Sequence, residues 1–297
     1  MGAQPLPVRY EGRGDRGRVG VLTLDPGERP VVVIDAGLVA RLEATLGALP
    51  DDLAGLVVAS GSERVFVAGA DLKEIQAADD AALLAYLEHT ADVFGRLSQL
   101  PYPTAAAING AALGGGLELA MHCDGLIGAP SASGRPYPVG LPEAGLCICP
   151  GWGGTNLLPA RVDAEDAIRR TASGTAMTFD EACEAGLFDQ VCEAVGGLVE
   201  QAIEWVCGQS TPERDGAPSR WIGRVDVAGG VGRALAACRA EIEQSEAGGA
   251  VVDCVGVGLE QGWDAAIARE RESLVRLRHT RAARDAIEGF FAKSAKR

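Results

Sequence analysis

At 297 residues and with a net charge of −14, the chain is long enough for one large domain and too acidic to favour nucleic acid or an anionic membrane as a partner. Its composition, 47% hydrophobic and 23% charged, is typical of an ordinary soluble globular protein. Residues 1–20 contain arginines among glycines and no apolar core, and the apolar stretch 105–121 is short and interrupted by polar residues. We therefore expect no secretory signal, no membrane span and a cytoplasmic protein.

The cysteines and histidines favour neither disulfides nor a metal site. The chain has eight cysteines and three histidines, and no two cysteines stand at CxxC spacing. In a chain of this size without an export signal, cysteines are expected to be reduced thiols. We also expect no bound metal, because the residues that commonly hold zinc are scarce and dispersed.

The first half of the chain alternates short apolar runs with segments of helical periodicity. Short apolar runs that end at turns or Gly-rich segments predict strands at 19–24, 56–59 and 104–108. Leucines at helical spacing predict helices at 37–49 and 79–100, and 110–121 passes from a Gly-rich loop into a helix. Alternating strands and helices indicate an α/β architecture.

The second half is more helical. Thr178 and Glu181 form a capping-box pattern that opens a short helix, and a strand-like run follows at 188–192. The stretch 208–232, rich in Gly, Pro, Asp and Arg, is expected to connect elements, and 263–291 carries an apolar helical stripe. The sequence predicts a core over residues 1–195 and a helical C-terminal region over 196–297.

One Gly-rich motif can be set aside. Residues 12–17 match GxGxxG, but the apolar strand follows the motif instead of preceding it, and no helix opens after it. A dinucleotide site needs the order strand, glycines, helix. We expect no nicotinamide or flavin cofactor.

Two other junctions have the expected order and small residues. AGADL at 68–72 and NGAALGGGLELA at 109–120 each follow a strand and lead into a helix. Small side chains leave backbone N–H groups uncovered, and two such groups from separate loops can stabilise a negatively charged carbonyl oxygen. The same glycines can equally serve only for tight turns and close packing. The residues alone do not favour the oxyanion site over the packing role or the reverse.

Two carboxylates lie in apolar surroundings. Glu118 follows the triple glycine within an apolar helix turn, and Glu143 follows Gly140-Leu141-Pro142. Burial raises the pKa of a carboxyl group toward the range useful for acid–base catalysis. Two such groups could hold and deliver a water molecule, although Glu118 could instead complement the helix dipole.

Together these motifs resemble the crotonase (enoyl-CoA hydratase/isomerase) superfamily. AGADL at 68–72, NGAALGGGLELA at 109–120, CD at 123–124, GLPE at 140–143 and PGWGGT at 150–155 occur in the order of that family. The C-terminal region is most similar to the hydratase part of multifunctional fatty-acid oxidation proteins, and we expect a stand-alone version of that part. The resemblance implies a crotonase-like spiral of ββα turns with a helical C-terminal region, assembled as a homotrimer or hexamer.

The resemblance also implies the roles of individual residues. The N–H groups of Ala70 and Gly115 would form an oxyanion hole for the thioester carbonyl, and Glu118 and Glu143 would position and transfer protons of water. A last group would bind the coenzyme A part of the acyl-CoA substrate: Ala68, Asp71, Leu72 and Lys73. Coenzyme A belongs to the substrate, so no separate cofactor is expected.

The favoured function is therefore hydration of a 2-enoyl-CoA by a hydro-lyase of fatty acid metabolism. Another acyl-CoA reaction of the same family is the alternative: isomerisation, decarboxylation, thioester hydrolysis or C–C cleavage. A non-catalytic subunit that keeps the fold is a third possibility, against which the retention of both glutamates and both small-residue loops speaks. Fold by itself does not distinguish these chemistries.

Overall fold

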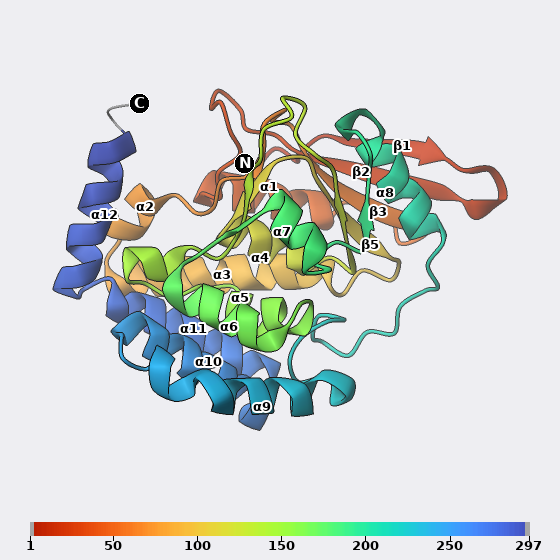
Figure 1. Cartoon of the computed structure of the whole chain (residues 1–297). Coiled ribbons are helices and arrows are strands. Elements are labelled where there is room, and N and C mark those ends of the chain that lie inside the picture. Colours follow the sequence, from red (N-terminus) through yellow and green to blue (C-terminus); the bar gives the residue numbers. More distant parts are fainter. Residues whose placement is uncertain (1–2, 295–297) are drawn as a thin grey trace. The chain divides into compact units, whose positions relative to one another are not determined.

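The computed structural model describes residues 3–294 (Figure 1). Its contacts divide the chain into two compact units. The first unit comprises Met1–Ala70, Asp92–Val139 and Met177–Ser219, and the second comprises Asp71–Ala91, Gly140–Ala176 and Arg220–Arg297. Both units are assembled from separated segments, so the chain passes repeatedly from one to the other. The boundary near residue 195 stays a prediction based on the sequence.

The first unit is built around a six-stranded sheet in the order β1-β2-β3-β5-β7-β10. The strands are β1 (Val8–Gly12), β2 (Arg18–Leu24), β3 (Gly55–Ser60), β5 (Thr104–Ile108), β7 (Gly125–Gly128) and β10 (Gln190–Val191). From β2 onward every neighbouring pair is parallel, and β1 joins β2 antiparallel. The predicted strands at 19–24, 56–59 and 104–108 are confirmed as β2, β3 and β5.

A second, smaller sheet has the order β4-β6-β8-β9. Its strands are β4 (Val65–Val67), β6 (Ala111–Leu113), β8 (Pro138–Gly140) and β9 (Met177–Thr178). Strands β3, β5 and β7 of the large sheet are each followed along the chain by a strand of the small one, β4, β6 and β8. A helix then follows β4 and β6, namely α2 (Leu72–Ala77) and α4 (Gly115–Met121). This repetition of strand, strand and helix confirms the predicted ββα turns.

The remaining helical elements of the first unit are α1 (Ala36–Leu46), α7 (Phe179–Glu184), α8 (Leu198–Cys207) and the 3-10 turns η1 (Gly14–Arg16) and η4 (Val195–Gly197). Helix α8 packs against β3, β5 and β7 (Figure 1). The strands make room for it with glycines, since a Cβ on Gly125 would lie 2.5 Å from the Trp205 ring and one on Gly55 would lie 2.7 Å from Val206. The predicted capping box at Thr178 and Glu181 opens α7.

The second unit is helical. Its helical elements are α2, α5 (Gly154–Leu157), α6 (Ala164–Ser173), α9 (Val225–Ile242), α10 (Glu246–Gln261), α11 (Trp263–Leu277), α12 (Arg281–Ser294) and the 3-10 turns η2 (Glu143–Leu146) and η3 (Leu158–Ala160). Helix α10 lies between α9 and α11 (Figure 1). The long helix α3 (Asp80–Leu97) begins in the second unit and ends in the first.

Several expectations need correction or completion. The stretch 208–232 was expected to connect elements, but α9 already begins at Val225. The apolar stripe at 263–291 is divided between α11 and α12. Within the GxGxxG segment, residues Gly14–Arg16 form the short turn η1 between β1 and β2. All eight cysteines, which fall within the described residues, are free thiols. Within residues 3–294, no helix has both the length and the apolar character needed to cross a membrane.

A close backbone approach in the first unit joins β4 to α4. A Cβ on Gly116 would lie 2.5 Å from the carbonyl oxygen of Val67. A Cβ on Gly69, whose φ is +106°, would lie 3.2 Å from the carbonyl oxygen of Leu113. Only glycine allows the two backbones to meet at both points, because any larger residue would force them apart.

Gly116→Ala should therefore destabilise the protein by about 1–3 kcal/mol, since overpacking outweighs the better helix propensity of alanine. Gly95→Ala is the matched control, because Gly95 lies in α3 and a Cβ added there would meet no heavy atom of the described residues within 4 Å. That variant should be as stable as the parent or more stable by up to about 1 kcal/mol. Chemical denaturation measures both, and equal effects of the two substitutions would contradict the argument.

A buried ion pair ties the segment after α8 to the sheet. Arg214 donates to both carboxylate oxygens of Asp124, at 2.7 and 2.9 Å, and the two side chains are only 12% and 14% exposed. The guanidinium also donates to the carbonyl oxygens of Leu100 and Tyr102, at 2.9 and 3.1 Å. Asp124 in turn accepts hydrogen bonds from the backbone N–H and the hydroxyl of Thr104.

Arg214→Met should lower the free energy of unfolding by about 3 kcal/mol, because it leaves the Asp124 carboxylate buried without its counter-charge. Arg239→Met serves as the control, since Arg239 pairs with Glu243 on the helix surface. Its loss should cost less than about 1 kcal/mol. Urea unfolding of the two variants measures the difference. Equal decreases in the free energy of unfolding would show that the Arg214 pair contributes no more than a surface ion pair.

Candidate active site

The first small-residue loop leaves an N–H group that points away from its strand partner. After β4, the Ala68 N–H donates to the Val32 carbonyl oxygen and the Ile34 N–H donates to the Gly69 carbonyl oxygen, both at 2.9 Å. Ile34 and Ala70 form an isolated parallel bridge. In such a bridge Ile34 bonds to the neighbours of Ala70. The N–H of Ala70 is therefore directed to the other side of the loop.

The second loop supplies an N–H group at the beginning of a helix. Gly114, with φ +53°, is the N-cap of α4, and its carbonyl oxygen accepts the N–H groups of Leu117 and Glu118. Gly115 is the first helical residue, and the first N–H groups of a helix have no partner within it. The contacts of Gly69 with Leu113 and of Gly116 with Val67 place this loop directly against the first. Ala70 and Gly115 thus lie on two adjoining loops of one unit.

Glu118 follows in the first turn of α4 and is only 1% exposed. Every other residue of that helix is buried as well. The expectation that its apolar flanks bury this carboxylate is correct. The helix N-terminus favours a negative charge at this position.

Glu143 belongs to the second unit, where it begins the turn η2. Its Oε2 atom is buried and accepts no hydrogen bond from the described residues. Burial, and to a smaller extent the negative charge of the nearby Glu270 carboxylate, raise the pKa of Glu143 to about 8. Cys147, with φ +57°, closes the turn, and the Ile148 N–H donates to the Glu143 carbonyl oxygen at 3.2 Å. Glu143 is therefore placed to remain protonated at neutral pH.

The residues expected to bind coenzyme A are at the start of α2. Asp71 caps the helix, since its Oδ1 accepts the Lys73 N–H at 2.9 Å. Leu72 is partly buried, whereas the Lys73 side chain is exposed and forms no ion pair with any residue in 3–294. Ala68, in the first unit, is also exposed. No acidic side chain of the described residues therefore competes with a phosphate for the Lys73 ammonium group.

The expected site is thus distributed over both units. Ala70, Gly115 and Glu118 belong to the first unit, and Glu143 and Lys73 belong to the second. The pairing of Glu118 with Glu143 around one water molecule stays a prediction. Among the residues the structure describes, no group of three or more His, Cys, Asp and Glu side chains gathers in a way that could hold a metal ion.

Glu270 is a buried acid that the sequence analysis missed. It lies on α11 in the apolar stripe of Trp263, Ile267, Leu274 and Leu277, and it is 0% exposed. An acidic residue at a core position of an amphipathic helix is a recognisable signal, because ionisable side chains are almost never fully buried unless they are paired.

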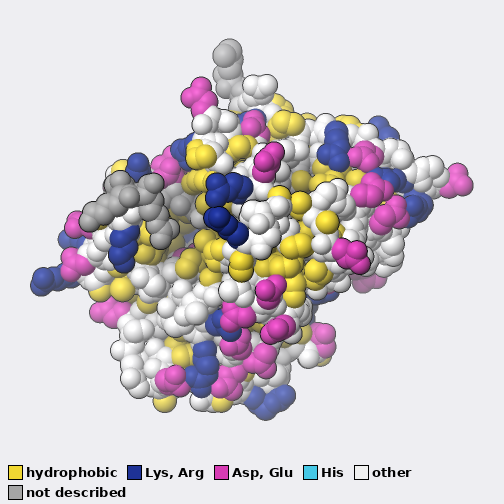
Figure 2. Space-filling model, turned by 45° about the horizontal axis from the view of Figure 1, so that its top comes forward, with side chains coloured by type: hydrophobic (Ala, Val, Ile, Leu, Met, Phe, Trp, Pro, Cys, Tyr) yellow, Lys and Arg dark blue, Asp and Glu magenta, His cyan; other side chains and the backbone are white. Residues whose placement is uncertain are grey.

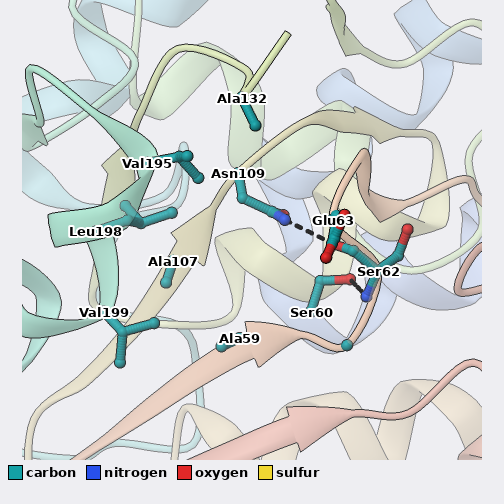
Figure 3. Close-up of a pocket in the computed structure, with 11 residues that line it drawn as sticks. Ala59, Ser60, Ser62, Glu63, Ala107, Asn109, Ala132, Val195, Leu198 and Val199 are labelled. Atoms are coloured by element: carbon teal, nitrogen blue, oxygen red, sulfur yellow. Dashed lines mark hydrogen bonds between the residues drawn. The ribbon is translucent and has the colours of Figure 1, made fainter.

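A pocket of the first unit has Asn109, the first residue of the 109–120 segment, in its lining. This pocket of about 450 Å³ opens where β3 and β5 end, with Val195, Leu198 and Val199 on one side (Figure 3). Asn109 spans it and donates to the Ser62 carbonyl oxygen at 2.7 Å.

On the face drawn in Figure 2, acidic and basic side chains are interspersed, without the broad basic surface that nucleic acid requires.

Comparisons with known proteins agree with this architecture. The alpha subunit of the fatty acid oxidation complex of Idiomarina loihiensis is 32% identical over 92% of this chain, which spans only 39% of that subunit. An enoyl-CoA hydratase structure from Bacillus anthracis is 26% identical over 98% of this chain and 96% of its own, with a TM-score of 0.59. The human mitochondrial delta3-delta2-enoyl-CoA isomerase shares the fold, with a TM-score of 0.67, 20% identity and coverage of 97% and 98%.

The family model for enoyl-CoA hydratase/isomerase matches residues 16–209, which is more than half of the chain. The matched region contains both small-residue loops, Glu118 and Glu143. The chain belongs to the enoyl-CoA hydratase/isomerase family.

Proposed function

We propose that this protein hydrates a 2-enoyl-CoA thioester. The observation that carries the proposal is the direct contact of the two glycine-containing loops, with the Ala70 and Gly115 N–H groups on adjoining backbones and buried Glu118 three residues after Gly115. Two converging N–H groups suit an oxygen that becomes negatively charged during the reaction, and each such donor typically lowers the barrier by about 3 kcal/mol. A thioester carbonyl conjugated to a double bond is such an oxygen.

The proposed reaction needs one base and one acid. Glu118 takes a proton from water, and the resulting hydroxyl adds to C3 of the enoyl group. The electron pair of the double bond moves toward the thioester, so the negative charge collects on the oxygen held by the two N–H groups. Glu143 then gives its proton to C2. A carboxyl group with a pKa near 8 carries that proton at neutral pH, which supports the role of acid for Glu143.

The proposed substrate class is supported by the relative and by α2. The Idiomarina relative is named for fatty acid oxidation, and we propose a fatty acyl chain on the thioester. Lys73 is proposed to face the coenzyme A phosphates, with the exposed Ala68 and the helix start at Asp71 and Leu72 near the adenine.

Glu118→Gln and Glu143→Gln should each slow the hydration of crotonyl-CoA by ~10²-fold or more, because each removes one proton-transfer group. The double variant should be scarcely slower than either single one, since groups that act as a unit are not additive. Glu88→Gln, at an exposed position of α3, is the control and should keep full activity. Loss of absorbance of the conjugated thioester measures the rates.

The same variants separate hydration from double-bond isomerisation. Isomerisation needs only one carboxylate that moves a proton along the acyl chain. If Glu118→Gln were nearly silent while Glu143→Gln were inactive, the isomerase would replace the hydratase as the proposed activity. A chain that binds coenzyme A thioesters and turns none of them over would instead be a binding subunit.

Lys73→Ala should weaken the binding of coenzyme A, and the effect should grow as salt is removed, because screening of the phosphate attraction decreases. Lys293→Ala is the matched control: Lys293 is an exposed lysine on α12, far along the chain from the motif. Titration calorimetry at low and moderate salt gives the dissociation constants. An unchanged constant for Lys73→Ala at low salt would remove Lys73 from the site.

A further inference from the structure

Helix α11 and the loop at 150–155 pack tightly together within the second unit. A Cβ on Gly151 would lie 3.2 Å from Leu274, and one on Gly153 would lie 2.6 Å from the ring of Trp263 and 3.1 Å from Ile267. These three side chains stand on one face of the helix, with Ile267 one turn after Trp263 and Leu274 two turns after Ile267. Glu270 lies on the same face between them. The loop therefore follows the shape of α11, and Glu270 is at the centre of the contact.

Both carboxylate oxygens of Glu270 accept hydrogen bonds from this loop. The Gly153 N–H donates to Oε2 at 2.5 Å, and the Thr155 N–H donates to Oε1 at 2.8 Å. The Thr155 hydroxyl is also in hydrogen-bond contact with Oε1. A carboxylate that is fully buried but accepts several hydrogen bonds is held in its charged form by them. All of these donors come from the loop, so the bonds also anchor it.

The direction of the hydroxyl bond follows from its other partner. The Asn156 amide donates from Nδ2 to the Thr155 oxygen at 2.9 Å. Because that oxygen already accepts a hydrogen bond from an amide that has only protons to offer there, the hydroxyl proton of Thr155 is available to Glu270. Asn156 thus donates to Thr155, and Thr155 donates to Glu270. Because Oε1 of Glu270 is the last acceptor of this series, the series favours the charged carboxylate.

Glu143 begins the turn η2, which precedes the loop at 150–155 in the same unit, and the charge of Glu270 acts on its pKa. Burial raises the pKa of Glu270, while the hydrogen bonds from Thr155 and Gly153 oppose this. For Glu143, whose Oε2 has no such bond among the described residues, the negative Glu270 adds to the effect of burial. Two neighbouring buried acids do not both ionise easily. Glu270, with its donors, holds the charge, and Glu143 holds the proton.

The other charged or titratable neighbours do not cancel this effect. Cys149, which directly precedes the loop, and Cys254 from α10 are hydrogen-bonded thiols, and their mutual contact and burial raise the pKa of Cys149. Arg271 on α11 favours the charged form of Glu270. The turn η2 also packs against α6 and α12. Charged side chains pair within each of these helices: Arg169 with Glu165 and Arg170 with Asp166 in α6, and Arg281 with Asp285 in α12.

We propose that Glu270 is a positioning residue for Glu143: its buried carboxylate anchors the Gly153–Thr155 loop to α11 and, by its charge, keeps Glu143 in the protonated form. Glu270 itself does not touch the substrate in this role. The catalytic part of the inference rests on the proposed function, because a protonated Glu143 is useful only to a reaction that needs an acid there. The electrostatic part concerns the protein alone and can be measured without substrate.

Glu270→Gln tests the proposal, because it removes the charge while nearly preserving the shape. Without that charge the protonated form of Glu143 is less favoured, so the pKa of Glu143 should fall by about one unit or more from its value of about 8. Carbon-13 NMR of protein labelled at the glutamate carboxyl carbon follows the titration, and Glu143→Gln identifies the signal. Glu272→Gln, on the same helix but exposed, is the control and should leave the titration unchanged.

The pH dependence of turnover gives an independent measurement. In the parent protein, kcat/KM should decline as the pH rises through about 8, where Glu143 loses its proton. In Glu270→Gln this decline should begin about one unit lower. Thr155→Val is a second variant, which keeps the Glu270 carboxyl group but removes the hydroxyl donor. Thr155→Val should shift the Glu143 titration in the same direction by a smaller amount. If Glu270→Gln does not fold, Thr155→Val tests the proposal in its place.

The outcomes separate the two proposals. A folded Glu270→Gln protein with an unmoved Glu143 titration would overturn the role of Glu270, even in an active hydratase. If the titration shifts as expected but no enoyl-CoA is hydrated, the positioning by Glu270 stands and the proposed function fails. If neither Glu270→Gln nor Thr155→Val moves the titration relative to Glu272→Gln, Glu270 is a structural anchor only.

Discussion

The carbonyl oxygen of Val67 lies where a side chain at position 116 would have to be, and this contact between two backbones determines how the first unit is built. Strand β4 and helix α4 can adjoin only because the residues at the crossing have no side chain. The consequence is chemical as well as structural. Where side chains are absent, backbone N–H groups remain accessible, so the glycines that permit the packing also expose the donors that a developing oxyanion needs.

In the second unit, helix α11 holds the Gly-rich loop at 150–155 in one conformation. Three of the six residues at 150–155 are glycine, and such a loop loses much conformational entropy on folding. Helix α11 packs Trp263, Ile267 and Leu274 against the loop, and Glu270 supplies hydrogen-bond acceptors for the loop N–H groups. Apolar packing and a buried carboxylate thus act on the same few residues.

The two units also use buried charge in different ways. In the first, Arg214 and Asp124 neutralise each other and fasten a long connecting segment, which serves stability. In the second, Glu143 and Glu270 are both acids, burial raises the pKa of each, and the hydrogen bonds from Thr155 and Gly153 favour the charged form of Glu270 alone. Two groups of opposite charge, such as Arg214 and Asp124, hold a segment of chain in place. Two neighbouring acids, such as Glu143 and Glu270, instead favour the protonated form of one of them. The second arrangement costs stability, because a carboxyl group that is buried without a counter-charge is less stable than one in water.

Much of this protein could be predicted from its sequence. Apolar runs and leucine spacing located β2, β3, β5, α1 and α3 within a few residues, because burial against a sheet imposes those patterns locally. The motif order indicated the family, and the apolar flanks of Glu118 indicated its burial. Tertiary structure alone decided the three-residue strands β4, β6 and β8, which are too short to show a period. It also decided the glycine-rich start of α9, where the packing of Val231, Leu235 and Cys238 overrides poor helix propensity. The raised pKa of Glu143 comes first from burial and then from Glu270, a residue distant in the chain, and folding alone creates both.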